Sequence, residues 1–325
     1  MKKLVVAILS VSMLLTSVTL FAGGARADRP FPSRDITIFL GQAAGGGNDL
    51  TVRALIPSLE RTLGVSVVPI NNTAGRGAVA FTEVSNARPD GYRLFFHSKS
   101  VLLMRYAGID EARIERLTPV AQVAEDVAIF LVRYDSPWRN MNDLISHLRT
   151  SPARVRTGNS GMGQLWHLSQ ILFEQTIGTD NILPVQYGGS TPMLVALVAG
   201  EIELAVTGPE AITFIESGQL RPLAVVYPTR YPSLPDIPTL YEETGYSFDF
   251  PVWRGFFTTA GTDPETVRIL ANALEIAVQS EEFRRFTATG MIGYFRGPQE
   301  FGQVVDAERR RLEVMMPGVM ARIQQ

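Results

Sequence analysis

Apolar residues occur along this chain in short blocks that alternate with stretches of helical periodicity. Residues 36–40 form an apolar block that leads into a glycine-rich loop at 43–49. Apolar residues then recur at helical spacing until Gly64, and a second apolar block covers residues 65–70. The order strand, glycine loop, helix and strand is a βαβ unit and predicts a parallel sheet.

The same order occurs again in the middle of the chain. A short strand at 155–157 runs into a glycine-rich loop at 158–163, and a helix is expected over 164–176. Further strands are expected over 92–96, 127–132, 183–187, 204–206 and 223–226, and further helices over 78–87 and 140–148, from Asp263-Pro264 and from Pro298. The pattern predicts two α/β lobes, each with a glycine loop at the carboxyl ends of its strands, where ligands of such sheets bind.

The first 27 residues have the pattern of a secretory signal peptide. Lys2 and Lys3 precede an uncharged apolar stretch over residues 4–21, and Ala25-Arg26-Ala27 is a small-x-small cleavage signal. The alternative is a membrane anchor, because about 18 apolar residues can span a bilayer. Cleavage is favoured, and the mature chain of residues 28–325 contains no second apolar stretch of that length. We therefore expect an exported, soluble protein.

Composition removes several classes of function. The chain has 325 residues and no cysteine, which excludes disulfides, thiolate nucleophiles and cysteine-ligated metals. Its 30 basic and 32 acidic residues give no basic excess, so nucleic acid is not an expected partner. The run Arg309-Arg310-Arg311 is expected to lie on a solvated helix face.

The two glycine loops are candidates for an anion site. Glycines allow a ligand to approach the backbone, and the helix behind each loop directs free N–H groups and a partial positive charge to the same place. Asn48 or Asp49 is expected to cap the first helix, and Asn159, Ser160 and Gln164 offer neutral hydrogen-bond groups at the second. The alternative is that the glycines serve only the geometry of tight turns.

Catalytic motifs are not evident in the sequence. His97, His147 and His167 are far apart and show no metal-ligand spacing, and neither a phosphate-binding P-loop nor a G-x-S-x-G motif is present. His167 is expected to be structural, and Trp253 is expected in the core rather than on a ligand. No catalytic residue, metal site or cofactor is predicted.

Motifs along the whole mature chain resemble those of the solute-binding proteins of tripartite tricarboxylate transporters, also called the Bug family. Residues 43–49, A-A-G-G-G-N-D, are similar to the family's A-A-G-G-x-x-D loop, and residues 158–163 with His167 resemble its G-S-x-G-x-G…H loop. Further similar segments lie at 31–37, 71–77, 89–92, 219–225, 234–239, 253–255 and 260–264.

The resemblance implies an α/β, two-lobed type II periplasmic binding protein fold with a ligand cleft between the lobes. The implied first lobe comprises residues 28–126 and 252–325, and the implied second lobe comprises residues 127–251. The implied protein is a periplasmic receptor and a monomer. It captures a small organic carboxylate, closes over it by hinge motion and delivers it to integral membrane transporter subunits.

Several positions depart from the family pattern. Gly41-Gln42 stands where the family commonly has Pro-Phe, and Asn159 and Gln164 stand where Ser or Thr is common. These changes make the expected cleft rich in amides. We therefore hypothesise a ligand with several oxygen acceptors, such as a di- or tricarboxylate, rather than a purely aromatic acid.

The expected ligand contacts lie at the ends of strands and in the loops that follow them. They are Gln42, Ala44, Gly45, Asn48, Asp49, Ser98, Asn159, Gly161, Gly163, Gln164, Tyr187, Gly189 and Thr207. Backbone N–H groups are expected to bind the anion, and the amides and hydroxyls to select its other groups. Two alternatives remain at this point: a ligand sensor that signals to a membrane histidine kinase, and a secreted α/β hydrolase.

Overall fold

The computed structural model describes residues 30–323 except 160, 162, 249, 251 and 289. The predicted signal peptide, residues 1–27, lies outside the described residues, as does Ser160. Within the described part of the chain, no helix combines the length and the apolar character that a membrane span requires.

The first sheet has six strands in the order β11-β4-β10-β3-β1-β2. These strands are β1 (Ile36–Leu40), β2 (Val67–Asn71), β3 (Arg93–Ser98), β4 (Leu117–Asp126), β10 (Val252–Thr259) and β11 (Ile292–Arg296). β1 pairs in parallel with β2 and β3, while β10 is antiparallel to both β3 and β4, and β11 is antiparallel to β4.

The second sheet has five strands in the order β7-β6-β8-β5-β9. These strands are β5 (Ala128–Arg133), β6 (Val155–Asn159), β7 (Ile182–Gln186), β8 (Leu204–Thr207) and β9 (Leu220–Val226). β6 is parallel to β7 and β8, whereas β5 is antiparallel to β8 and β9. The parallel pairing predicted from the βαβ pattern is therefore correct for part of each sheet, and both sheets are mixed.

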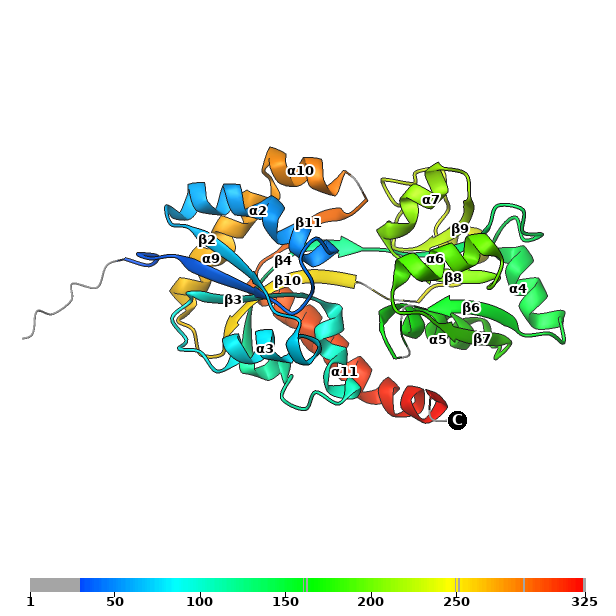
Figure 1. Ribbon diagram of the computed structural model, residues 1–325, viewed down its shortest axis with the longest axis horizontal. Helices are drawn as coiled ribbons and strands as arrows, with labels where there is room; N and C mark the ends of the chain where they lie inside the picture. The colour runs from blue at the N-terminus through cyan, green and yellow to red at the C-terminus, as the bar shows by residue number, and fades with distance from the viewer. Residues whose placement is uncertain are drawn as a thin grey trace, which may run out of the picture. The chain divides into compact units, whose positions relative to one another are not determined.

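Helices accompany both sheets (Figure 1). The helices that accompany the first sheet are α2 (Gly47–Leu63), α3 (Ala78–Ser85), α9 (Pro264–Val278), α10 (Glu281–Thr287) and α11 (Pro298–Ile323). With the second belong α4 (Met141–Thr150), α5 (Leu165–Ile177), α6 (Ser190–Ala199), α7 (Ile212–Glu216) and α8 (Leu240–Thr244). Short 3₁₀ turns are η2 (Ala74–Gly77), η3 (Lys99–Leu103), η4 (Arg105–Ala107), η5 (Ile114–Arg116) and η6 (Pro209–Ala211).

We call each sheet with its helices a lobe. The chain leaves the first sheet at Asp126, the end of β4, and enters the second at Ala128. It leaves the second sheet at Val226 and returns to the first at Val252. The fold is therefore α/β with two lobes, while the boundaries of 28–126, 127–251 and 252–325 remain predictions.

Capping explains where several helices begin. Asp263 accepts hydrogen bonds from the N–H groups of Glu265 and Thr266, and Pro264 occupies the first turn of α9, as predicted. Asn140 caps α4 by accepting from the N–H of Asp143. Thr239 and Glu242 form a capping box at the start of α8.

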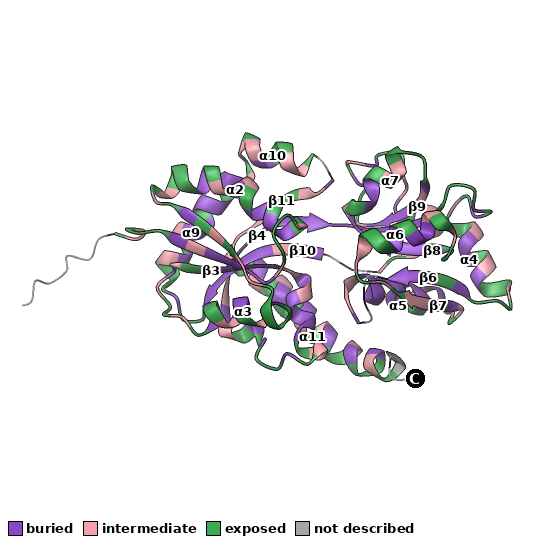
Figure 2. Ribbon diagram, viewed as in Figure 1, coloured by how far each residue is buried: buried purple, intermediate pink, exposed green. Residues whose placement is uncertain are grey.

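Both sheets are mainly buried, and Figure 2 shows their strands largely in purple. Trp253 is fully buried, and its ring lies edge-on to Phe301 of α11 with the ring centroids 5.1 Å apart. The prediction that Trp253 belongs to the core is confirmed. The same aromatic cluster includes Phe257, which also packs on Phe301. This cluster fixes β10, and with it the neighbouring residue Arg254, in the centre of the first sheet.

Three strands of the first sheet, β4, β10 and β11, were not expected from the hydrophobic pattern. β4 contains three buried polar residues, Gln122, Glu125 and Asp126. They interrupt the apolar pattern by which a buried strand is predicted from sequence. β10 contains Arg254 and Gly255 within an otherwise apolar run. These unexpected strands contribute charged groups to the site described below.

Candidate functional site

The first glycine loop connects β1 to α2. Ala44 and Gly45 are exposed, and Gly45 has a φ of 79°, a conformation that favours glycine. The N-cap residue of α2 is Gly46, and no side chain caps the helix. The expectation that Asn48 or Asp49 caps this helix is therefore wrong, because both lie inside its first turn.

Asp49 lies in the first turn of α2, and its side chain bonds back to the glycine loop. Its Oδ2 accepts hydrogen bonds from the Gly45 N–H and from Arg53 Nε, each at 2.8 Å. Burial raises the pKa of Asp49, but hydrogen bonds from Arg53, from the Gly45 N–H and from Asn71 outweigh this effect and hold the pKa below 3.8. The carboxylate is thus ionised and engaged with its own loop.

Asn48 belongs to a chain of hydrogen bonds along the first lobe's side of the predicted cleft. Its Nδ2 donates to Gln42 Oε1 at 2.9 Å, and its Oδ1 accepts from Arg254 Nη1 at 2.7 Å. Gln42 Nε2 lies 2.5 Å from Nε2 of His97. The two predicted contact residues, Gln42 and Asn48, are therefore held by each other and by two residues that were not predicted.

His97 is a neutral acceptor in this chain. Burial is the main cause that lowers its pKa to about 4, and the charge of Arg254 lowers it further, although a hydrogen bond to the Ser98 carbonyl opposes both. With Nδ1 donating to the Ser98 carbonyl at 3.0 Å, Nε2 is left to accept from the Gln42 amide. Ser98, a predicted contact at the end of β3, has its hydroxyl 2.8 Å from that of Ser100.

Arg254 and Asp126 form a nearly buried ion pair at the end of this chain. Asp126 Oδ2 accepts from Arg254 Nε at 3.1 Å and Nη2 at 2.7 Å, and the two side chains are 13% and 4% exposed. Burial raises the pKa of Asp126, and the guanidinium opposes that effect. A Cβ at Gly47 would lie 2.9 Å from Arg254 Nη1, so a glycine there lets the guanidinium approach the start of α2.

The second glycine loop connects β6 to α5 and relies more on backbone groups. Asn159 is buried, and its Oδ1 accepts from the Gly161 N–H at 3.1 Å. The Gly163 N–H donates to Nδ1 of His167 at 2.9 Å, which agrees with the structural role predicted for that histidine. Gln164 is the N-cap residue of α5, and its side chain makes no capping bond. Gly161 and Gly163 have φ values of 139° and 72°.

The remaining predicted contacts lie near the start of α6. The Tyr187 N–H donates to the Asn159 carbonyl at 3.0 Å, and Gly189 is the N-cap residue of α6. Thr207, at the end of β8, is buried, and its Oγ1 lies 3.0 Å from Ser190 Oγ and 3.1 Å from Glu210 Oε1. Ser190 and Glu210 were not predicted.

The hydrogen bonds thus connect the predicted residues within each lobe. In the first lobe they join Gln42 to Asn48 and Gly45 to Asp49, and in the second they join Asn159 to Gly161 and to Tyr187. The most informative residue missed is Arg254. A charged residue inside the apolar run of residues 252–257 was the available signal for it.

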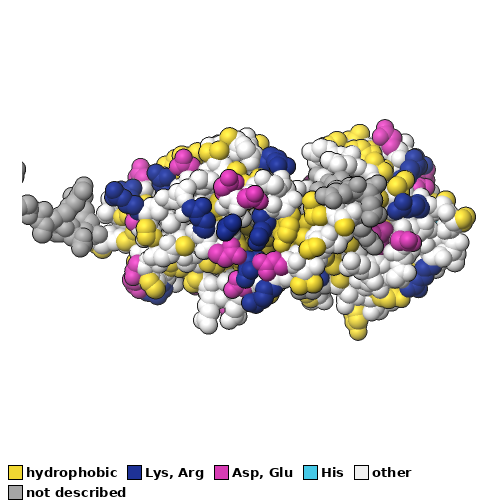
Figure 3. All heavy atoms as spheres, turned by 90° about the horizontal axis from the view of Figure 1, so that it is seen from below, with side chains coloured by type: hydrophobic (Ala, Val, Ile, Leu, Met, Phe, Trp, Pro, Cys, Tyr) yellow, Lys and Arg dark blue, Asp and Glu magenta, His cyan; other side chains and the backbone are white. Residues whose placement is uncertain are grey.

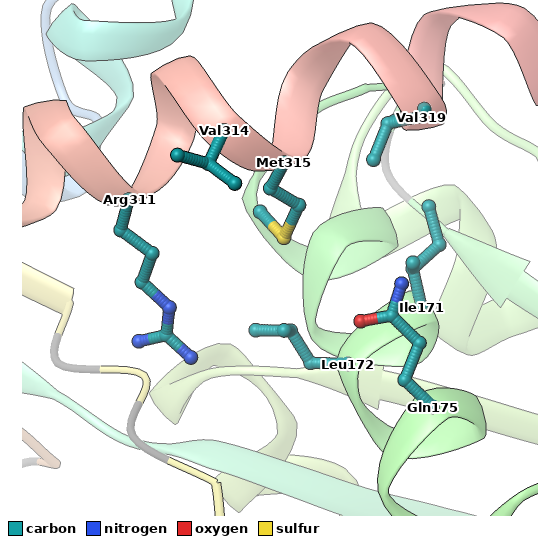
Figure 4. Close-up of a pocket in the computed structure, with 8 residues that line it drawn as sticks. Ile171, Leu172, Gln175, Arg311, Val314, Met315 and Val319 are labelled. Atoms are coloured by element: carbon teal, nitrogen blue, oxygen red, sulfur yellow. The ribbon is translucent and has the colours of Figure 1, made fainter.

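Two cavities are lined by residues of both lobes. One of about 710 Å³ is lined by aromatic and charged side chains that include Glu125, Tyr227 and Arg296. Another of about 660 Å³ lies between α5 and α11. Figure 4 shows Leu172 and Gln175 of α5 on one side of it and Arg311 and Met315 of α11 on the other. None of the predicted contact residues lines either cavity.

The surface carries interspersed charges of both signs, as Figure 3 shows for one face. Arg309 lies within 4 Å of Glu115, Asp306 and Glu313, so its charge is offset locally. Among the described residues, no three His, Asp or Glu side chains are grouped as metal ligands would be.

Comparison with known proteins gives concordant matches. Residues 51–317 match the TctC family, described as the tripartite tricarboxylate transporter family receptor. A UPF0065 protein of Bordetella pertussis is 31% identical over 269 residues, which cover 82% of this chain and 82% of that protein.

Solved structures of similar proteins match over most of the chain. A TctC solute-binding protein from Polaromonas has a TM-score of 0.78 and 26% identity, with 90% of this chain and 99% of that chain covered. Rpa4515 of Rhodopseudomonas palustris, solved with adipate, has a TM-score of 0.73 and 28% identity, with coverages of 89% and 98%. MatC of the same species, solved with bound malate, has a TM-score of 0.69 and 26% identity, with coverages of 87% and 99%. The chain therefore belongs to the tripartite tricarboxylate transporter family of receptors, which are solute-binding proteins and not enzymes.

Proposed function

We propose that this protein is a periplasmic receptor that captures a small organic carboxylate between the β1–α2 and β6–α5 loops. In this proposal the two lobes close over the ligand by hinge motion, and the closed form delivers it to the integral membrane subunits of a tripartite transporter. The ligands of the two solved Rhodopseudomonas palustris proteins, adipate and malate, are both carboxylates and support the proposed ligand class.

The starts of α2 and α5 are the main support for a carboxylate site. Both glycine loops lead into helices, α2 and α5, whose N-termini have no side-chain cap. The first N–H groups of a helix have no partner within the helix, and the helix dipole places partial positive charge there. A carboxylate that reaches both loops would satisfy these donors without requiring a dedicated lysine or arginine.

The side chains beside the loops favour a ligand with several oxygen acceptors. The side-chain amide nitrogens of Gln42 and Asn48 each carry two hydrogens. Gln42 donates one of its hydrogens to His97, and Asn48 donates one of its hydrogens to Gln42, so each amide keeps one hydrogen for a ligand. Gln164 contributes a further amide at the second loop. We therefore propose a di- or tricarboxylate rather than a purely aromatic acid.

Thermal unfolding of the refolded, ligand-free protein against a panel of carboxylic acids tests this function. A ligand at about 100 times its Kd adds about 2.7 kcal/mol of stability, which raises Tm by a few degrees for a chain of this size. One acid that raises Tm, while its uncharged alcohol analogue does not, is the expected result. The absence of any shift across the panel would refute the proposed ligand class.

Two glycine variants test the location of the site. Gly45 and Gly64 have φ values of 79° and 69°, and a Cβ on either would meet no atom within 4 Å. Gly45→Ala and Gly64→Ala should therefore lower stability to a similar extent, whereas only Gly45→Ala, in the loop, should weaken binding of the acid. Equal effects on binding would place the site elsewhere.

A pull-down with the ligand-bound receptor tests the partner. Recovery of integral transporter subunits is the expected result. Recovery of a membrane histidine kinase instead would replace uptake by a sensing role.

A further inference from the structure

Glu210 stands beside the proposed ligand site without being part of either glycine loop. It lies in η6, directly after β8, and its Oε1 accepts a hydrogen bond from Ser190 Oγ at 2.6 Å. Ser190 is the first residue of α6, and the buried Thr207 Oγ1 lies 3.1 Å from the same carboxylate oxygen. The negative charge of Glu210 therefore lies at the start of α6. Two of the predicted ligand contacts, Gly189 and Thr207, lie in the same place.

Glu210 has no counter-ion in the described part of the chain. Among the residues that the structure describes, no Lys, Arg or His forms an ion pair with Glu210, and no donor reaches its second oxygen, Oε2. Both groups that bond to Oε1 are neutral hydroxyls. The side chain is exposed, which allows a carboxylate to remain charged without a counter-ion.

A second carboxylate faces the same region from the first lobe. Asp126 is 4% exposed, and its Oδ1 has no hydrogen-bond partner in the described part of the chain. The partner of Asp126 is Arg254, which uses Nε and Nη2 for Asp126 Oδ2 and Nη1 for Asn48, so these bonds all lie within the first lobe. The charge of Glu210 is close enough to contribute to the raised pKa of Asp126.

The contacts around η6 agree with this placement. A Cβ on Gly290, in the segment before β11 of the first lobe, would lie 3.3 Å from Pro209 Cβ and 2.5 Å from Ile212 Cδ1. The hydroxyl of Tyr231 in the second lobe also donates to the Gly290 carbonyl. The turn that carries Glu210 therefore lies directly against the first lobe.

We propose that Glu210 is a specificity-determining residue, which selects carboxylates that also carry a hydrogen-bond donor, a hydroxyl or an ammonium group. The inference rests on the proposed carboxylate-binding function and narrows it. Oε2 of Glu210 accepts the ligand's hydroxyl or ammonium hydrogen, while a bare carboxylate in the same place meets like charge and no donor. An acid without such a donor therefore loses the hydrogen bond to Oε2, and an acid without an ammonium group also loses the charge that would offset Glu210.

Isothermal titration calorimetry with malate and succinate tests the proposal, because the two acids differ by one hydroxyl group. Hydrogen bonds to charged groups contribute enough that the wild-type protein should bind malate at least about tenfold more tightly than succinate. In Glu210→Gln the difference should fall to about threefold or less, since Gln retains the hydrogen bonds to Ser190 and Thr207 but loses the charge. Glu216→Gln is the matched control, because Glu216 is an exposed glutamate at the end of α7. It should behave as the wild type.

The outcomes distinguish a failure of the role proposed for Glu210 from a failure of the proposed receptor function. Equal binding of the two acids by the wild type, or an unchanged preference in Glu210→Gln, overturns the role of Glu210 and leaves the carboxylate receptor intact. If the thermal panel identifies another acid, that acid and its analogue with hydrogen in place of one hydroxyl or amino group are compared. A tightest-binding acid without any such group also overturns the role of Glu210. Failure of every acid to bind refutes the proposed function itself.

Discussion

The two sides of the candidate site use polar groups in different ways. In the first lobe, Gln42, Asn48, His97, Arg254 and Asp126 form a chain of hydrogen bonds, and Arg254 pairs with the nearly buried Asp126. In the second lobe, the backbone N–H groups of Gly161 and Gly163 each bond to one side chain, and Glu210 has no counter-ion among the residues that the structure describes.

Burial explains the difference. Asp126 and His97 are each 4% exposed, so a charge or an unpaired donor among them is costly, and the chain of hydrogen bonds satisfies nearly every group. Glu210 is exposed, and water stabilises its charge without a counter-ion among the described residues. We infer that the first side supplies a fixed surface, while the second side distinguishes between ligands.

Removal of Arg254 should have the largest effect on stability. Arg254→Ala leaves Asp126 buried without a counter-charge, and we expect the free energy of unfolding to fall by about 3–5 kcal/mol. Urea denaturation followed by circular dichroism measures the change. The double variant Arg254→Ala/Asp126→Asn should recover most of it, and a loss below about 1 kcal/mol in the single variant would show that the pair does not hold the first side together.

Acidification should weaken the first lobe through His97. Its folded pKa of about 4 lies below the ordinary 6.5, so the stability that the neutral ring contributes is complete above pH 6.5 and is lost as the pH falls toward 4. The shift corresponds to about 3 kcal/mol. Denaturation at several pH values should show a shallower dependence in His97→Gln than in the wild type, and identical profiles would contradict a buried neutral His97.

Loss of the Asn48 side chain should have an intermediate effect. Asn48→Ala removes the acceptor of Arg254 Nη1 and the donor to Gln42 Oε1, which lie in a nearly buried chain. We expect a loss of about 2 kcal/mol in the free energy of unfolding. Asn86→Ala, on the exposed end of α3, is a control for the residue type, and an equal loss in both variants would argue against the chain of hydrogen bonds.

The smallest change is expected in the second lobe. Thr207→Val keeps the shape of a buried side chain but removes the hydroxyl near Glu210, and we expect a loss of about 1 kcal/mol. The preference for malate over succinate should persist, because the Ser190 hydroxyl still holds the carboxylate. Loss of that preference would make Thr207, rather than Glu210, the selective group.

The sequence predicted those features of the fold that depend on residues close together along the chain. Helical spacing and capping predicted α9, the glycine runs predicted both strand–loop–helix units, and the motifs indicated the family. The polar connections were missed because they join distant parts of the chain: Arg254 is 128 positions from Asp126 and 206 from Asn48. These pairs form because β10 lies between β3 and β4 in the sheet. The order of strands in a sheet is not specified by the pattern of residues within any one segment.

The role of Asn48 illustrates the same limit at short range. Its position after three glycines suggested a helix cap or a ligand contact; the cap is wrong, and the ligand contact stays a prediction. In the fold, Asn48 lies within the first turn of α2 and is engaged on both sides by Gln42 and Arg254. The partner that decides its role lies on a strand that the hydrophobic pattern did not show.

A crystal structure of the protein with its tightest-binding acid tests the central claim most directly. We predict one ligand carboxylate on the backbone N–H groups of the β1–α2 and β6–α5 loops, with a ligand hydroxyl or ammonium group on Oε2 of Glu210. An acid bound instead in the 710 Å³ cavity lined by Glu125, Tyr227 and Arg296 would contradict it.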